Sequence, residues 1–166
     1  MLVTLCCFFP AAFASAQDDG SVLPFPPTPS ASKAGPTLQE SNTVTINLEV
    51  GENASGVLYA LGGASGGLSC SMDQGHLCFE YNMMIIERYL AKSAEEIPPG
   101  KHTIVVETIL KAPKPGAPAD IVLSVDGKEV ARTTAKMTVP AAFTASESFD
   151  VGTDLGSTVS RDYYER

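Results

Sequence analysis

The alternation of apolar and polar residues is clearest from residue 42 onward. Every second residue from Val44 to Val50 is apolar, and the residues between them are polar. A period of two is typical of a strand with one buried face, so we expect a strand over 42–50. Segments rich in apolar and β-branched residues predict further strands at 56–61, 101–110 and 141–151. Strands at such short intervals, separated by turn residues, predict an all-β fold, an antiparallel β-sandwich.

Two dipeptides predict tight hairpin turns. A two-residue turn at Gln74-Gly75 sets Met72 opposite Leu77 and gathers the apolar residues of that hairpin on one face. Asp126-Gly127 supplies the positive φ angles of a second tight turn. In the second hairpin we expect Leu123 to face Val130 across the ladder.

The register of the first hairpin also decides the state of its two cysteines. With a two-residue turn, Cys70 and Cys78 lie on opposite faces, so we expect two free thiols. A three-residue turn would set the cysteines opposite each other. It would also move His76 and Glu80 onto the apolar face, which the side-chain period forbids.

The segment 81–90 is harder to assign, because its composition suits a helix as well as a strand. Its position between a hairpin and the turn at Pro98-Pro99-Gly100 favours a strand. Within it, Met83–Ile86 is a continuous apolar run. We expect this run to be buried between layers rather than to serve as a docking patch.

The first residues have the pattern of a leader. A short apolar run is followed by Ala14-Ser15-Ala16, the small-x-small pattern of a signal-peptidase site, although no Lys or Arg precedes the run. We therefore expect a signal peptide over 1–16 and a periplasmic or secreted protein. Residues 17–41 are rich in Pro, Ser, Ala and Gly and predict a linker or tail. The sandwich domain is then expected over 42–166.

Charge excludes one class of partner. The chain has 11 Lys+Arg against 19 Asp+Glu, a formal net charge of −8. Nucleic-acid binding requires a basic surface that neutralises phosphates, so we expect no nucleic acid as a partner. Apart from the signal peptide, no segment is expected to contact a membrane.

Several segments, taken in order, resemble the C-terminal β-sandwich of bacterial arylsulfatases, and the resemblance covers nearly all of 42–166. They are Gly56–Gly63 with Gly66–Ser69, Tyr81-Asn82, Pro99–Thr103, Val125–Lys128 and Phe149–Asp154. A second segment, Leu23–Ser41, looks like the mature N-terminus of the same enzymes. In that family a much longer catalytic domain lies between the two parts, whereas here they abut near Ser41.

The resemblance implies a jelly-roll sandwich of the laminin-G/concanavalin type. Domains of that family continue past the residues that match Tyr163–Arg166 into one more apolar strand. We therefore expect this sandwich to lack its last strand and to self-associate through a sheet edge. The implied role is a non-catalytic accessory domain of a secreted arylsulfatase, whose partner is the catalytic domain. The alternative is a free-standing carbohydrate- or protein-binding sandwich, although the chain has no Trp to stack on sugars.

The family's chemistry does not carry over to this chain. Its nucleophile is a formylglycine made in a Cys/Ser-x-Pro-x-Arg motif, and paired aspartates hold calcium. The nearest match, Ser157–Arg161, has Val159 in place of the proline. Cys7–Pro10 misplaces its proline, and Asp18-Asp19 lies in the predicted tail. We therefore expect no enzyme activity and no catalytic, cofactor or metal residues, because formylglycine and calcium belong to the missing catalytic domain.

A few other polar residues are candidates for chemistry. His76 follows a turn and His102 begins a strand, so we expect solvated or edge histidines rather than catalytic ones. Asp150, Asp154 and Asp162 have oxygens suitable for calcium, but turn and capping roles are favoured.

Overall fold

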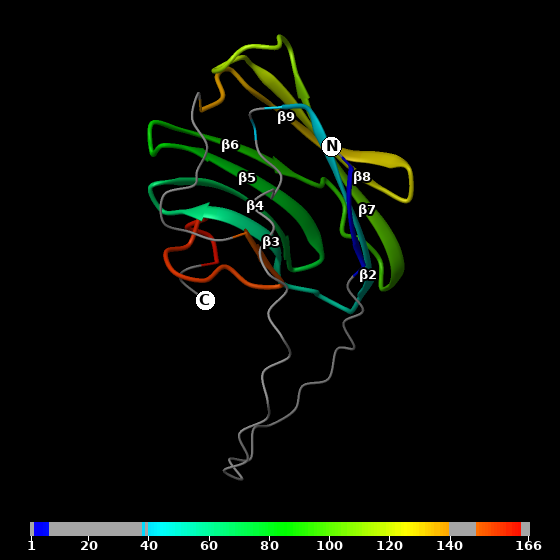
Figure 1. The fold of residues 1–166 in the computed structure, drawn as a ribbon. Coiled ribbons are helices and arrows are strands. Elements are labelled where there is room, and N and C mark those ends of the chain that lie inside the picture. Colours follow the sequence, from blue (N-terminus) through cyan, green and yellow to red (C-terminus); the bar gives the residue numbers. More distant parts are fainter. Residues whose placement is uncertain (1, 7–37, 39, 140–148, 164–166) are drawn as a thin grey trace.

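The structure is a computed structural model that describes residues 2–6, 38, 40–139 and 149–163. These residues form ten strands and no helix, and the strands lie in two five-stranded sheets that face each other (Figure 1). The predicted β-sandwich is therefore confirmed. The jelly-roll subtype and the missing last strand stay predictions.

The first sheet, sheet A, has the strand order β1-β2-β7-β8-β9. Its strands are β1 (Leu2–Cys6), β2 (Asn42–Val50), β7 (Gly100–Leu110), β8 (Ala119–Val125) and β9 (Lys128–Ala135). β2 and β7 pair over nine residues without a register shift. The alternation that predicted β2 is visible in its burial, since Val44 and Ile46 face the core.

The second sheet, sheet B, has the order β10-β3-β4-β5-β6 and is antiparallel throughout. Its strands are β3 (Gly56–Gly63), β4 (Gly66–Asp73), β5 (His76–Met83), β6 (Glu87–Lys92) and β10 (Phe149–Val151). The expected strand over 81–90 is thus two strands joined by a turn. The structure describes only the last three residues of the expected strand over 141–151, and they form β10. Residues 140–148 lie outside the described residues.

The core fills the space between the two sheets. Sheet A contributes aliphatic side chains such as Ile104 and Leu123, and sheet B contributes larger ones such as Phe79 and Tyr81, all at most 2% exposed. The rings of Tyr81 and Tyr89 stack with centroids 5.9 Å apart. The hydroxyl of Tyr81 accepts a 2.8 Å hydrogen bond from the Val139 amide, so this aromatic pair also anchors the segment that follows β9.

Both predicted hairpin turns are confirmed. Gln74 and Gly75 have φ angles of 47° and 83°, and Met72 pairs with Leu77 as expected. Asp126 and Gly127 likewise have positive φ angles.

The register of the second hairpin was predicted wrongly beyond the turn. A bulge between Leu123 and Ser124 sets Leu123 opposite Ala131, so Val130 is not its partner. Such a bulge increases the local twist of a sheet, which a turn dipeptide does not encode.

The structure describes only parts of the predicted signal peptide and linker. Residues 2–6 of the predicted signal peptide form β1, which pairs in parallel with β2, while cleavage after Ala16 stays a prediction. Most of the predicted linker lies outside the described residues. Leu38, close to its end, is only 3% exposed and belongs to the core cluster.

Candidate functional site

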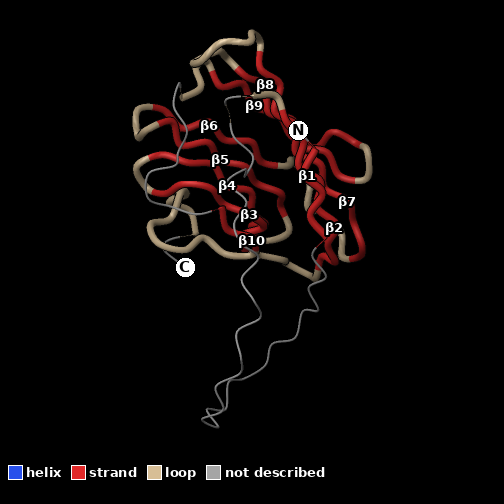
Figure 2. The backbone as a smooth tube through the Cα atoms, in the orientation of Figure 1, coloured by secondary structure: helices blue, strands red, loops and turns tan. Residues whose placement is uncertain are grey.

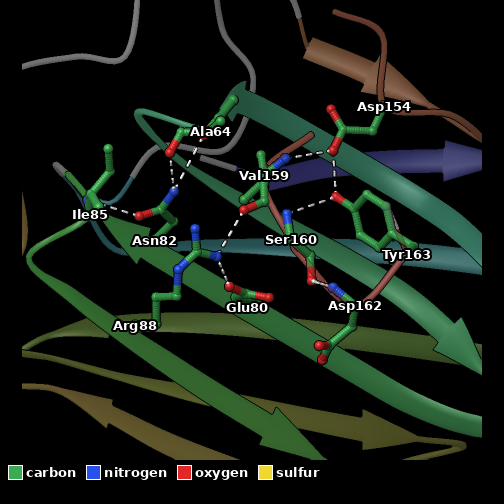
Figure 3. A network of polar contacts seen from close by, with 11 residues as sticks. Ala64, Glu80, Asn82, Ile85, Arg88, Asp154, Val159, Ser160, Asp162 and Tyr163 are labelled. Carbon is green, nitrogen blue, oxygen red and sulfur yellow. Dashed lines mark hydrogen bonds and ion pairs between the residues drawn. The ribbon is translucent and has the colours of Figure 1, made fainter. Parts of the chain in front are cut away.

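The outer face of sheet B carries polar side chains that are nevertheless buried. Ser69, Glu80 and Asn82 are 2%, 6% and 0% exposed, although they point away from the inter-sheet core. Residues 152–163, here called the C-terminal strap, cross this face after β10 (Figure 3). The strap therefore gives sheet B a second covered face.

Close packing holds the strap against the sheet. Val159 is fully buried, and a Cβ added to Gly67 would lie 2.8 Å from its Cγ2 atom and 2.4 Å from the Leu61 carbonyl oxygen. Only glycine leaves room for the strap at this point. The Asp154 carboxylate accepts hydrogen bonds from the Val159 amide, at 2.9 Å, and from the Tyr163 hydroxyl. Burial and the bond to Asp154 raise the pKa of Tyr163 well above its usual value.

An ion pair lies beneath the strap. Arg88 on β6 pairs with Glu80 on β5, and their side chains are 20% and 8% exposed. The same guanidinium nitrogen donates a 3.0 Å hydrogen bond to the Val159 carbonyl. Because Arg88 contacts both the sheet and the strap, it fixes one to the other (Figure 3).

The turn between β5 and β6 is held by Asn82. Its side-chain amide donates to the Ala64 carbonyl at 2.9 Å, and its Oδ1 accepts from the Ile85 amide at 2.9 Å (Figure 3). Met84 and Ile85 have φ angles of 53° and 67°. The left-handed region is unfavourable for a β-branched residue, so the bonds of Asn82 maintain a strained backbone here.

This turn exposes large apolar side chains. Met84, Ile85 and Ile86, here called the apolar turn, are 53%, 59% and 73% exposed. The expectation that Met83–Ile86 is buried between layers was therefore right only for Met83, which is 3% exposed. The hairpin reverses after Met83 and carries the next three residues beyond the end of the sheet, a fact that hydrophobicity alone does not reveal.

A groove of about 260 Å³ lies beside the strap on the outer face of sheet B. Its floor includes a 3.0 Å ion pair between Lys92 and Asp73. Leu90, 55% exposed, and Tyr163 of the strap also line it. The half-buried thiol of Cys78 opens into the groove, whereas Cys70 is buried in the core and its pKa is strongly raised by desolvation. Neither Cys70 nor Cys78 forms a disulfide, as the hairpin register predicted.

The two histidines are half-buried and hydrogen-bonded, so the expectation of solvated or edge side chains was wrong. His102 Nδ1 lies 2.7 Å from Asp126 Oδ2, as in a catalytic dyad, but Nε2 lies 2.8 Å from the Pro98 carbonyl. The nitrogen that would activate a nucleophile is thus already engaged. His76 Nδ1 lies 2.9 Å from the Ser93 carbonyl. Both histidines connect loops to strands.

Of the aspartates considered for calcium, Asp150 lies in β10, and Asp154 and Asp162 lie in the strap that follows it. Asp150 accepts the Leu155 amide at 2.9 Å and Asp154 accepts the Val159 amide, which are the turn roles favoured from the sequence. Among the described residues no three His, Cys, Asp or Glu side chains are grouped to hold a metal ion. Ser157–Arg161 forms part of the strap. Cys7–Pro10 and Asp18-Asp19 lie outside the described residues.

The geometry can thus display the three apolar side chains of the turn and, separately, offer a small groove on the outer face of sheet B. Within the part of the chain that is described, no helix has the length and apolar character needed to cross a membrane. Comparison with known proteins adds no family: no protein-family model, no curated protein and no solved structure matches this chain.

Proposed function

We propose that this chain is a non-catalytic accessory β-sandwich that docks on a larger protein through the apolar turn. The resemblance of 42–166 to the C-terminal domain of bacterial arylsulfatases suggests the catalytic domain of such an enzyme as that partner. It also suggests export to the periplasm or the medium. The observation that carries the proposal is the exposure of Met84–Ile86 on a strained backbone held by Asn82.

Energetics favours a docking role for this turn. Burying a large apolar side chain contributes about 1.5–3 kcal/mol, and three neighbours on one turn form a compact anchor. Because Asn82 already fixes the turn, little conformational entropy is lost when a partner covers it. A lipid surface is a poorer match, since a chain of net charge −8 is repelled by anionic headgroups.

The docking test uses a bacterial arylsulfatase from which the C-terminal sandwich has been deleted. We expect the full-length chain to bind it in calorimetry and to raise its melting temperature. Ile86→Ser should weaken binding at least about tenfold, the loss expected when one large side chain is no longer buried. Ile109→Ser is the matched control, because Ile109 is also exposed, at 46%, but lies on sheet A. Absence of binding, or equal losses from both variants, would refute docking through this turn.

The same proposal excludes catalysis by the isolated chain. We expect no hydrolysis of an aryl sulfate ester, with or without calcium and a formylglycine-generating enzyme. Turnover that follows the protein through purification and exceeds a heat-killed control would overturn it.

The groove favours a second candidate, a free-standing sandwich that binds a small uncharged ligand such as a sugar. Its apolar walls at Leu90 and Tyr163 flank the Lys92–Asp73 pair, which suits a ligand with one apolar face and several hydroxyl groups. Leu90→Arg would fill the groove without touching the apolar turn. Glycan-array binding by the unmodified chain that is lost in this variant, together with no docking by either protein, would favour the second candidate.

A further inference from the structure

Two sheets present four edges, and three of them carry features that discourage pairing with another strand. β10 is only three residues long, and β6 carries Glu87, Arg88 and Lys92. β9 is also charged and pairs through a bulge. At the fourth edge the short strand β1 covers β2, which differs from all three: β2 is nine residues long, uncharged before Glu49, and pairs with β7 without a shift. Long, regular, uncharged edges recruit further strands.

The described structure shows one segment seated on this edge. β1 pairs with β2 from Leu2 opposite Thr43 to Cys6 opposite Asn47 (Figure 2). The pair is parallel, whereas every other pair of strands described is antiparallel. Its two strands are separated by residues 7–41, so no short connection imposes this pairing.

We propose that the outer edge of β2 is an acceptor site for an extended, uncharged, apolar segment that runs parallel to it. Leu2–Cys6 fills the site in cis but detachably, so that an equivalent segment of a partner protein replaces it. This surface lies on sheet A and is independent of the docking proposed for the apolar turn.

The chemistry of the paired residues defines the partner. The occupant reads Leu-Val-Thr-Leu-Cys, and the five facing residues of β2 are Thr, Val, Thr, Ile and Asn, so neither side carries a charge. Main-chain hydrogen bonds supply the affinity in strand addition, and alternate side chains supply the selectivity. The acidic net charge of the chain further disfavours acidic segments.

The length and direction of β1 make its pairing reversible. Five parallel residues form a short ladder, and parallel pairing is slightly less stable per residue than antiparallel pairing. Cleavage after Ala16, if it occurs as the sequence predicts, would remove β1 and leave the edge open for a partner.

The first experiment opens the edge within the full chain. Val3→Pro with Thr4→Pro removes two successive amide donors, one of which must face β2 because successive N–H groups point to opposite sides of a strand. We expect hydrogen exchange of β2 amides to become at least about tenfold faster, with β4 and β5 unchanged. Ser30→Pro with Ser32→Pro, in the proline-rich segment, is the matched control and should behave like the unmodified chain. Unchanged exchange in β2 would overturn the proposal.

The second experiment refills the edge with a synthetic peptide, Leu-Val-Thr-Leu-Ser, which carries a nitroxide label at its N-terminus. Added to the proline variant, it should slow β2 exchange again and broaden the NMR signals of Thr43 more than those of Val50, as a parallel orientation requires. A peptide with Asp in place of Val should do neither.

Three results of this second experiment would refute the proposal. One is a failure of the peptide to bind, and another is stronger broadening at Val50 than at Thr43. The third is a dimer of the variant through β2 that the peptide cannot displace, which would make the occupant a second copy. If the proline variant unfolds, the labelled peptide is added in excess to the unmodified chain, where a detachable β1 must still give way.

Discussion

Sheets A and B use the same hairpin chemistry but differ in how their outer faces are covered. In β2 and β7 of sheet A, buried residues alternate with half-exposed ones. In β4 and β5 of sheet B, runs of five successive residues are buried, because the C-terminal strap covers the outer face. The polar residues on that face are therefore structural parts of a second, smaller packing layer.

The ionisable groups of the two sheets differ in the same way. On sheet A, carboxylates held by hydrogen-bond donors have lowered pKa values. For Asp126 the first cause is the Thr103 amide, followed by His102, and for Glu129 it is Arg132. On sheet B, burial raises the pKa values of tyrosines, to about 12 for Tyr81. Acid and alkali should consequently act on different halves of the molecule.

The largest expected effect on stability comes from removing the cation of the ion pair on sheet B. The same change to an ion pair on sheet A is the control. Arg88→Met leaves Glu80 almost buried beneath the strap without its cation, and it also removes the bond to Val159. We expect a loss of about 3 kcal/mol in the free energy of unfolding. Arg132→Met is the control on sheet A, where the pair with Glu129 is half-exposed and screened by solvent, and it should change the free energy of unfolding far less. Urea unfolding measures both, and equal losses would show that the strap does not bury the pair.

Glycine substitutions test the same contrast with smaller effects. Gly67→Ala forces a Cβ against the Leu61 carbonyl and Val159, so it should lower the free energy of unfolding by about 1–3 kcal/mol. Gly51→Ala, after β2, meets no atom within 4 Å and should change stability by less than about 1 kcal/mol. Thermal unfolding of the two variants provides the comparison. A tolerated Gly67→Ala would mean that the strap does not pack at this point.

The contrast also explains how far the sequence could predict the structure. Turn dipeptides and alternation are local, so the Gln74-Gly75 hairpin and β2 were predicted correctly. The bulge at Leu123 was not predicted, because the twist of a sheet arises only in the folded protein. The exposure of Ile85 was not predicted either, because the bond from Asn82 to Ala64 that holds the turn also arises only on folding.

The position of the strap and the pairing of β1 could not be predicted for the same reason. Nothing in the composition of residues 152–163 shows which face they will cover, and an apolar N-terminus predicts a leader whether or not it can also pair with an edge. The candidate site was accordingly missed, although one signal was available: Gly66-Gly67, Ser69 and Asn82 give sheet B an outer face of small and amide side chains that suits close packing.

The pH dependence of stability should divide along the same line. Above its usual pKa, near 3.8, Asp126 contributes stability because its folded pKa is lower, and this contribution is lost as the pH falls through the folded value. Tyr81 contributes stability below its usual pKa of 10. This contribution is lost as the pH rises through its folded pKa of about 12. Asp126→Asn should flatten the acid limb of a urea-midpoint profile, and Tyr81→Phe the alkaline limb. If either variant flattens both limbs, the two halves are not independent.

The smallest expected effects on stability concern two adjacent isoleucines of the apolar turn. Glycine at these two positions should change the free energy of unfolding in opposite directions. Ile85 has a φ angle of 67°, where a β-branched residue is strained, so Ile85→Gly should raise the free energy of unfolding by about 1 kcal/mol. Ile86 is even more exposed but is not among the positive-φ residues, so Ile86→Gly relieves no strain and should lower stability by about 0.5–1 kcal/mol through the entropy of the unfolded chain. Because both side chains are largely exposed, lost packing contributes little to either value. Chemical denaturation at one pH measures both variants. Destabilisation by both would show that Asn82 does not hold Ile85 in the left-handed region, and the rigid display on which docking depends would then be lost.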